Sequence, residues 1–189
     1  MKKILAIISV VLLLPGCIPA AFVAGAAAGG AIIYDHRDTK TMINDRDAAF
    51  QIQNNLDLDK DLFKKAHLSV VAFNHIALLV GQVPNEELRK HAETIAKANS
   101  KIKVLYNEMT IGPPISHMQM TNDTWITTKV KTTLIATPGL SSTNLKIITE
   151  NGTVYLMGLI THQQADLATE KTKTVSGVEK IVKIFEYLG

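Results

Sequence analysis

Leu68–Val83 reads LSVVAFNHIALLVGQV, and Leu145–Ile160, 77 positions later, reads LKIITENGTVYLMGLI. The two stretches carry the same kinds of residue at matched positions. The matched pairs are Leu68 with Leu145, Val70 with Ile147, Asn74 with Asn151, Leu79 with Leu156, and Gly81 with Gly158. A recurrence at fixed separation indicates a duplicated unit of about 65 residues. The chain is therefore not a single domain.

Each of these stretches predicts a β-hairpin. In the first copy, Leu68–Ala72 alternates as a strand, Asn74-His75 forms the turn, and Ile76–Val83 is the second strand. In the second copy the turn is Asn151-Gly152, a strong two-residue hairpin signal, between strands at 145–149 and 153–160.

Helices and one further strand flank each hairpin. A helix that carries Phe50, Ile52 and Leu56 precedes the first hairpin, and another precedes the second. After the hairpins we expect helices at 85–99 and 162–174, followed by strands at 102–111 and 178–188. This order predicts an α+β fold in which two helices pack on one face of a three-stranded mixed sheet, because each element must hide one apolar face.

The first residues have the pattern of an export signal with a lipid attachment site. Two lysines precede the apolar run Ile4–Leu14, which is too short to span a bilayer, and LPGC follows at positions 14–17. This motif resembles the bacterial lipobox, which implies diacylglyceryl transfer to Cys17, cleavage before it and N-acylation. Cys17 is the only cysteine, so no internal disulfide can form. Ile18 in place of aspartate implies sorting to the outer membrane, where acyl chains such as palmitate would anchor the protein at the periplasmic face.

Two segments are predicted to be linkers. After a signal peptide over 1–16, an acylated N-terminus and linker cover 17–45, including the Ala/Gly-rich segment 18–33, which is expected to be a tether near the lipid surface. Between the copies, Pro113 and Pro114 break any regular element and begin a linker over 113–120. The first domain is thus placed at 46–112 and the second at 121–189. So short a connection predicts that the domains touch through a sheet edge or face.

Charge and motifs exclude several classes of function. Removal of the two signal lysines lowers the formal net charge from +3 to about +1. This near-neutral balance argues against nucleic-acid binding, because a nucleic-acid binder would show a basic patch or stripe. The six histidines stand at no metal-binding spacing. There is no phosphate loop or nucleophile elbow. We therefore expect no cofactor and no enzyme activity.

The element order, with Gly81 and Gly158 closing the second strands, resembles the BON domain of bacterial periplasmic and secreted proteins. The resemblance runs from the lipobox to Leu188 and is densest in NDTWITTKV at 122–130 and TENG at 149–152. It implies two tandem BON domains in a lipoprotein that supports outer-membrane integrity at the division site. It further implies binding of anionic phospholipid by the second domain and a link with the machinery that assembles outer-membrane β-barrels.

The residues of the second copy permit a separate test of lipid binding. On a helix that starts near Asn122, with Asn122-Asp123-Thr124 as the expected N-cap, Ile126, Val130 and Leu134 form the predicted buried stripe. Side chains beside and opposite this stripe combine one tryptophan, two lysines and an isoleucine, a composition typical of a surface among lipid headgroups. The predicted contact residues are Trp125, Thr128, Lys129, Lys131, Thr132, Ile135 and, beyond the helix, Leu140.

Two alternatives remain open on these residues. A single tryptophan in a small domain is as often packed in a core as exposed. If Trp125 is exposed, the expected ligand is phosphatidylglycerol or cardiolipin. The competing hypothesis is a protein-interaction scaffold, in which exposed strands or the same helix bind an envelope protein such as a component of the β-barrel assembly machinery.

Overall fold

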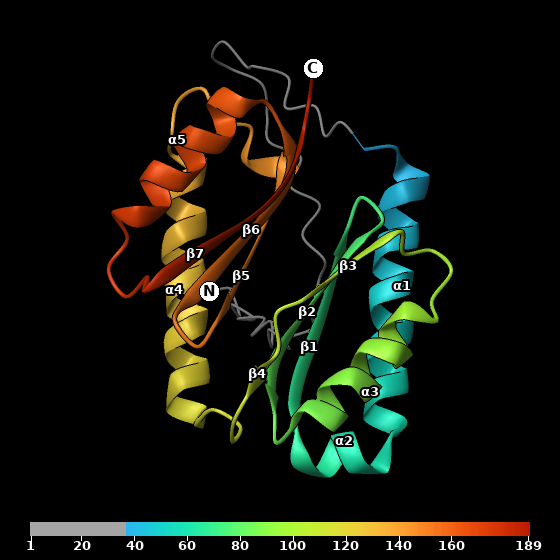
Figure 1. Cartoon of the computed structure of the whole chain (residues 1–189). Coiled ribbons are helices and arrows are strands. Elements are labelled where there is room, and N and C mark those ends of the chain that lie inside the picture. The colour runs from blue at the N-terminus through green and yellow to red at the C-terminus, as the bar shows by residue number, and fades with distance from the viewer. Residues whose placement is uncertain (1–36) are drawn as a thin grey trace, which may run out of the picture. The chain divides into compact units, whose positions relative to one another are not determined.

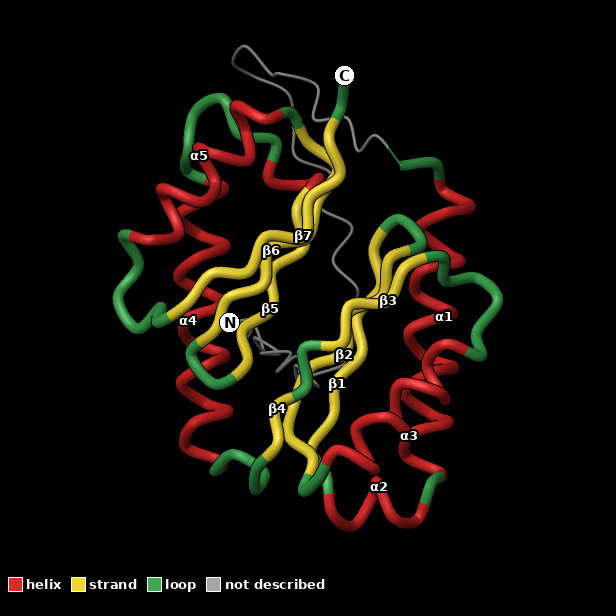
Figure 2. The backbone as a smooth tube through the Cα atoms, in the orientation of Figure 1, coloured by secondary structure: helices red, strands yellow, loops and turns green. Residues whose placement is uncertain are grey.

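The computed structural model describes residues 37–189 of the chain (Figure 1). These residues form two units with helices packed on one face of a mixed sheet (Figure 2). The predicted α+β class is confirmed. The predicted signal peptide, Cys17 and the segment 18–33 lie outside the described residues.

The first unit contains three helices and a mixed sheet. Its elements are α1 (Thr39–Leu58), α2 (Lys60–Lys65), β1 (His67–Phe73), β2 (Ile76–Val83), α3 (Glu86–Lys97), β3 (Val104–Asn107) and β4 (Thr110–Ile111). β1 pairs antiparallel with β2, whereas β3 and β4 both pair parallel with β2. The last strand, predicted as one run, is split because Met109 turns into the core and is only 4% exposed. Asn107 Oδ1 fixes this bend by accepting the Met109 amide at 3.3 Å.

The second unit repeats the order with an unbroken last strand. Its elements are α4 (His117–Ile135), a 3₁₀ turn (Ser142–Asn144), β5 (Leu145–Glu150), β6 (Thr153–Ile160), α5 (His162–Lys173) and β7 (Lys180–Tyr187). β5 pairs antiparallel with β6, and β7 pairs parallel with β6. The hairpins and turns predicted from the repeat are confirmed in both units.

The first helix of each unit begins earlier than the sequence indicates. α1 begins at Thr39, so the part of the predicted linker from Thr39 onward is helical. α4 begins at His117, and the Ser116 hydroxyl accepts the Gln119 amide at 3.1 Å as the N-cap. These first turns are mostly polar and add little to an apolar stripe, which is why periodicity does not detect them.

The predicted N-cap at Asn122-Asp123-Thr124 is wrong, because α4 already begins at His117. Asp123 lies inside α4 and is only 4% exposed. Its carboxylate accepts the amides of Asn151 and Gly152 at 2.7 and 2.9 Å. The residue therefore joins the helix to the β5–β6 turn.

The matched glycines are required by close packing between the hairpin strands. Gly81 pairs with Leu68, and a Cβ at Gly81, whose φ is +121°, would overlap the His67 carbonyl. A Cβ at Gly158 would lie 2.7 Å from the Asn144 carbonyl oxygen. Both positions are therefore closed to side chains, which accounts for the glycine at the same place in each copy.

Each unit has its own core between helices and sheet. In the first, Ile52 and Leu56 of α1 and Ala92 of α3 pack on Leu79 and Val83 of β2. In the second, the equivalent cluster joins α4, α5 and β6 through Ile126, Val130, Leu134, Ala168, Val154 and Leu156. The helices cover only one face of each sheet (Figure 2).

The opposite faces of the two sheets form a third apolar cluster, between the domains. Its buried members come from both sheets: Val71, Phe73, Ile76, Leu78 and Val80 from the first, and Tyr155, Met157 and Ile184 from the second. Gln82 Nε2 donates to Glu150 Oε1 at 2.7 Å across this contact, and Asn74 Nδ2 donates to Glu186 Oε2 at 2.7 Å. The prediction that the domains touch through a sheet face is confirmed.

Candidate functional site

The helix α4 carries the residues predicted to contact lipid. Ile126, Val130 and Leu134 are 6, 0 and 0% exposed, so the predicted buried stripe is confirmed. This stripe fixes which side of α4 faces away from the domain.

An uncharged stripe runs along the outer side of α4. It consists of residues at alternating spacings of three and four, all exposed: Met118, Thr121, Trp125, Thr128, Thr132 and Ile135. Its three large apolar members, Met118, Trp125 and Ile135, are 76, 64 and 69% exposed. Trp125 is therefore a surface residue and not part of the core.

The threonines of this outer stripe contribute little polarity to it. The hydroxyl of Thr121 donates to the His117 carbonyl at 2.9 Å, that of Thr128 to the Thr124 carbonyl at 2.9 Å, and that of Thr132 to the Thr128 carbonyl at 3.0 Å. Because each hydroxyl proton is used within the helix, the stripe requires fewer hydrogen bonds from water than its composition indicates.

One predicted lysine lies beside Trp125. Lys129 Nζ donates to the Ser176 carbonyl at 2.5 Å and to the Ser176 hydroxyl at 3.1 Å. With Trp125 and Gly177 it lines a pocket of about 340 Å³ between α4 and the turn before β7. Lys129 and Trp125 thus border the same pocket, and both residues remain exposed.

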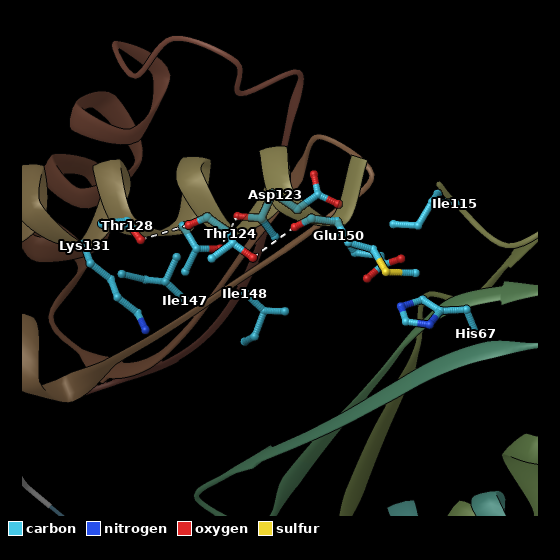
Figure 3. A pocket seen from close by; sticks show the side chains of 12 residues that line it. His67, Ile115, Asp123, Thr124, Thr128, Lys131, Ile147, Ile148 and Glu150 are labelled. Atoms are coloured by element: carbon cyan, nitrogen blue, oxygen red, sulfur yellow. Dashed lines mark hydrogen bonds between the residues drawn. The ribbon is translucent and has the colours of Figure 1, made fainter. Parts of the chain in front are cut away.

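The other predicted lysine lies on the opposite flank of the stripe. Lys131 and Thr128 line a groove of about 430 Å³ between α4 and β5 (Figure 3). His67, at the start of β1, and Ile115, just before α4, also border this groove. Glu150 lies in the same groove, and burial raises the pKa of its carboxyl, an effect that the hydrogen bond from Gln82 partly opposes. The predicted residues therefore occupy a ridge and its two flanks.

Leu140 does not join the other predicted residues. It is half-buried and packs against the core of the second domain, so part of its side chain is used in folding, and its contact with lipid stays a prediction. Met118, in contrast, is an exposed member of the stripe that the sequence does not predict, because it falls in the linker expected over 113–120. The three-and-four spacing back from Trp125 would have identified it.

Two further findings concern only residues 37–189. No helix in this range is long and apolar enough to cross a membrane. No group of three or more His, Cys, Asp or Glu residues in the range is arranged to hold a metal ion.

Comparison with known proteins places this architecture in a family. Residues 44–113 and 122–189 each match the BON domain. The outer membrane lipoprotein DolP of Haemophilus influenzae is 35% identical over 188 residues, covering 100% of this chain and 97% of the relative. The 21 kDa hemolysin of Actinobacillus pleuropneumoniae is 36% identical and is covered over 79% of its length by 82% of this chain.

Among solved structures, the C-terminal domain of CdsD from the type III secretion system of Chlamydia trachomatis is 15% identical, with a TM-score of 0.31 over 77% of this chain and 67% of that one. The family assignment rests on the two BON matches and on the full-length relative. The chain belongs to the BON-domain family, as a DolP-like outer-membrane lipoprotein with two tandem BON domains.

Proposed function

We propose that the outer stripe of α4 binds anionic phospholipid, phosphatidylglycerol or cardiolipin, at the surface of the outer membrane. The observation that carries this proposal is the 64% exposure of Trp125 in the middle of an uncharged stripe. An indole leaves the bilayer interface less readily than other side chains because its ring is apolar and its N–H can still reach water or headgroups. Met118 and Ile135 extend the apolar contact toward both ends of the helix.

The charge around the stripe favours anionic lipid over neutral lipid. Lys129 and Lys131 lie on its two flanks and are exposed, whereas Asp123, the helix's acidic residue, is buried on the core side. Each lysine near an anionic surface contributes about 1 kcal/mol and is screened by salt. Binding by α4 should therefore be modest and salt-sensitive, with the acyl chains expected on Cys17 holding the protein at the membrane.

This lipid binding would support outer-membrane integrity and direct the protein to the division site, without catalysis. An association with the β-barrel assembly machinery is a second candidate role, and an open strand edge described below favours it. In either role the protein acts as a binding module on the periplasmic face of the outer membrane.

The test is the affinity of Trp125→Glu for vesicles that contain phosphatidylglycerol. A full-length mature chain with Cys17→Ser serves as the background, so that no acyl anchor masks the helix. Phe50→Glu is the matched control, since Phe50 lies on α1 of the first domain and is 70% exposed. We expect Trp125→Glu to weaken binding roughly tenfold or more, equivalent to about 1.4 kcal/mol, and Phe50→Glu to leave it unchanged. Equal affinities for the two variants would refute the assignment of α4.

A further inference from the structure

The edge strands of the two domains differ in whether a side chain bonds to their outward backbone groups. β1 and β5 each stand at the edge of a sheet, with β2 and β6 as their partners among residues 37–189. In the first domain the side chain of Gln53 closes this edge: its Oε1 accepts the Val70 amide at 3.1 Å, and its Nε2 donates to the Leu68 carbonyl at 3.3 Å. One side chain thus occupies two of the backbone groups that β1 would offer to another strand.

Lys131 takes the place of Gln53 in the second domain. The buried residues of α1 and α4 match at a separation of 78 positions: Ala48 with Ile126, Ile52 with Val130, and Leu56 with Leu134. The same separation leads from Gln53 to Lys131. An ammonium group has donors but no acceptor, so Lys131 cannot accept a β5 amide as Gln53 accepts that of Val70.

The Val70 amide, one of the two groups that Gln53 binds, has an open counterpart in β5. Val70 matches Ile147 in the repeat. Glu150 and Thr153 flank a two-residue turn and pair with each other, so their backbone groups bond across the hairpin. The direction of backbone N–H and C=O groups alternates along a strand. Ile147 and Thr149 therefore point these groups away from β6. Within residues 37–189, no loop or side chain bonds to the amides of Ile147 or Thr149.

The groove described above runs along this edge. Ile147, Ile148 and Thr149 of β5 line it, with Thr128 and Lys131 of α4 on one side (Figure 3). Its volume of about 430 Å³ suits a short extended segment and not a folded domain.

The charges in the groove lie at different ends, and only one end favours a carboxylate. Asp123 and Glu150 lie toward the His67 end, where their carboxylates accept hydrogen bonds from the β5–β6 turn and from Gln82, whereas Lys131 lies at the other end (Figure 3). Lys131 forms no hydrogen bond or ion pair with any residue in 37–189, and Lys146, at the start of β5, is close enough to repel it. An added carboxylate at this end would relieve the repulsion between the two lysines.

We propose that the open edge of β5 binds an extended, acidic segment of another polypeptide as an additional strand. Main-chain hydrogen bonds to Ile147 and Thr149 would supply the affinity, and a carboxylate beside Lys131 would supply the preference. The first domain cannot bind in this way because Gln53 already occupies the equivalent edge.

Amide hydrogen exchange in the full mature chain tests whether the edge is open. We expect the Ile147 amide to exchange quickly and the Val70 amide slowly. Lys131→Gln should restore the missing acceptor and slow exchange at Ile147 roughly tenfold, the equivalent of one net hydrogen bond. Lys131→Met, which removes the charge without adding an acceptor, should not. A wild-type Ile147 amide as protected as that of Val70 would overturn the proposal.

A peptide titration without lipid tests the occupant. The probe is a short N-acetylated peptide of alternating valine and threonine with a central aspartate, and its control carries N-methyl groups at alternate residues, which removes the amide donors of one edge. We expect the first peptide to slow exchange at Ile147 and Thr149, and both the methylated peptide and the Lys131→Gln variant to abolish this effect. Absence of protection by the first peptide, or equal protection by both, would refute strand addition.

The peptide experiment is separable from lipid binding by α4. Trp125→Glu should bind the peptide as the wild type does, because Trp125 lines the pocket that contains Lys129 and not the groove along β5. Failure of the peptide to bind therefore leaves the vesicle result intact, and the reverse also holds.

Discussion

Asp45 and Asp123 are equivalent buried carboxylates that hold the hairpin turn of their own domain. Asp45 accepts the Asn74 and His75 amides at 2.6 and 2.8 Å, and Asp123 accepts the Asn151 and Gly152 amides at 2.7 and 2.9 Å. Each aspartate is 4% exposed. The turn residues Asn74, His75 and Asn151 have positive φ, so these hydrogen bonds hold a backbone that otherwise costs energy.

We expect Asp123→Asn to lower the free energy of unfolding by about 2 kcal/mol. The amide keeps one acceptor oxygen but brings an NH₂ group against a backbone N–H, and bonds to a charged acceptor are each worth about 1.5–3 kcal/mol. Urea unfolding measures the change. Asp166→Asn, on the exposed side of α5, is the control and should change the free energy by less than about 0.5 kcal/mol. A loss of similar size in both variants would contradict this role for Asp123.

Gly81→Ala should destabilise the first domain far more than Gly139→Ala destabilises the second. Both glycines have positive φ, +121° and +82°, so both substitutions strain the backbone. Only at Gly81 would the new Cβ also overlap the His67 carbonyl, whereas nothing lies within 4 Å of a Cβ at Gly139. Thermal unfolding should show a cost of about 1 kcal/mol at Gly139 and a clearly larger one at Gly81. Similar melting temperatures for the two variants would show that β1 can move aside.

Glu150→Gln should stabilise the contact between the domains at neutral pH. Burial raises the pKa of Glu150 above its ordinary value of 4.5, so the folded protein holds this proton more tightly than the unfolded chain does. The stabilising contribution is therefore present below pH 4.5 and is lost as the pH rises through the folded-state pKa. Glutamine keeps the Oε1 acceptor for Gln82 without the buried charge.

The measurement for Glu150 is the free energy of unfolding from pH 4 to pH 8. We expect the wild type to lose stability relative to Glu150→Gln as the pH rises, with Glu170→Gln on exposed α5 as the control. A constant difference between wild type and Glu150→Gln over this range would exclude the titration of Glu150 as its cause.

Local sequence signals predicted the parts of this fold that depend on neighbouring residues. The turn at Asn151-Gly152 and the buried spacing of Ile126, Val130 and Leu134 are such signals, and both are present in the structure. The roles of Asp45 and Asp123 could not be predicted, because their partners lie 28–30 positions away. Only the assembled domain brings them together.

The candidate site also contains features that the sequence predicts and features that it does not. The helical spacing placed Lys131 and Ile135 away from the core, but it could not decide whether Trp125 packs inward, since a residue at the edge of a stripe can turn either way. The open edge of β5 could not be predicted from the sequence either. It is recognised only from the hydrogen bonds that Gln53 makes to β1, which Lys131 does not make to β5.

Thr132 tests whether the stripe on α4 acts as an apolar surface. Its hydroxyl already donates to the Thr128 carbonyl at 3.0 Å, so the hydroxyl proton is bonded within the helix and not to water. Thr132→Val therefore does not change the number of hydrogen bonds to water that this proton would lose on lipid contact. We expect Thr132→Val to bind phosphatidylglycerol vesicles at least as tightly as the wild type. Thr132→Glu should bind more weakly, because it places a negative charge between Trp125 and Ile135 on a surface that faces anionic headgroups. Circular dichroism of both variants checks that α4 is intact. Weaker binding by Thr132→Val would show that the threonine hydroxyls contact lipid directly, and that hydrogen bonding rather than apolar contact governs this face.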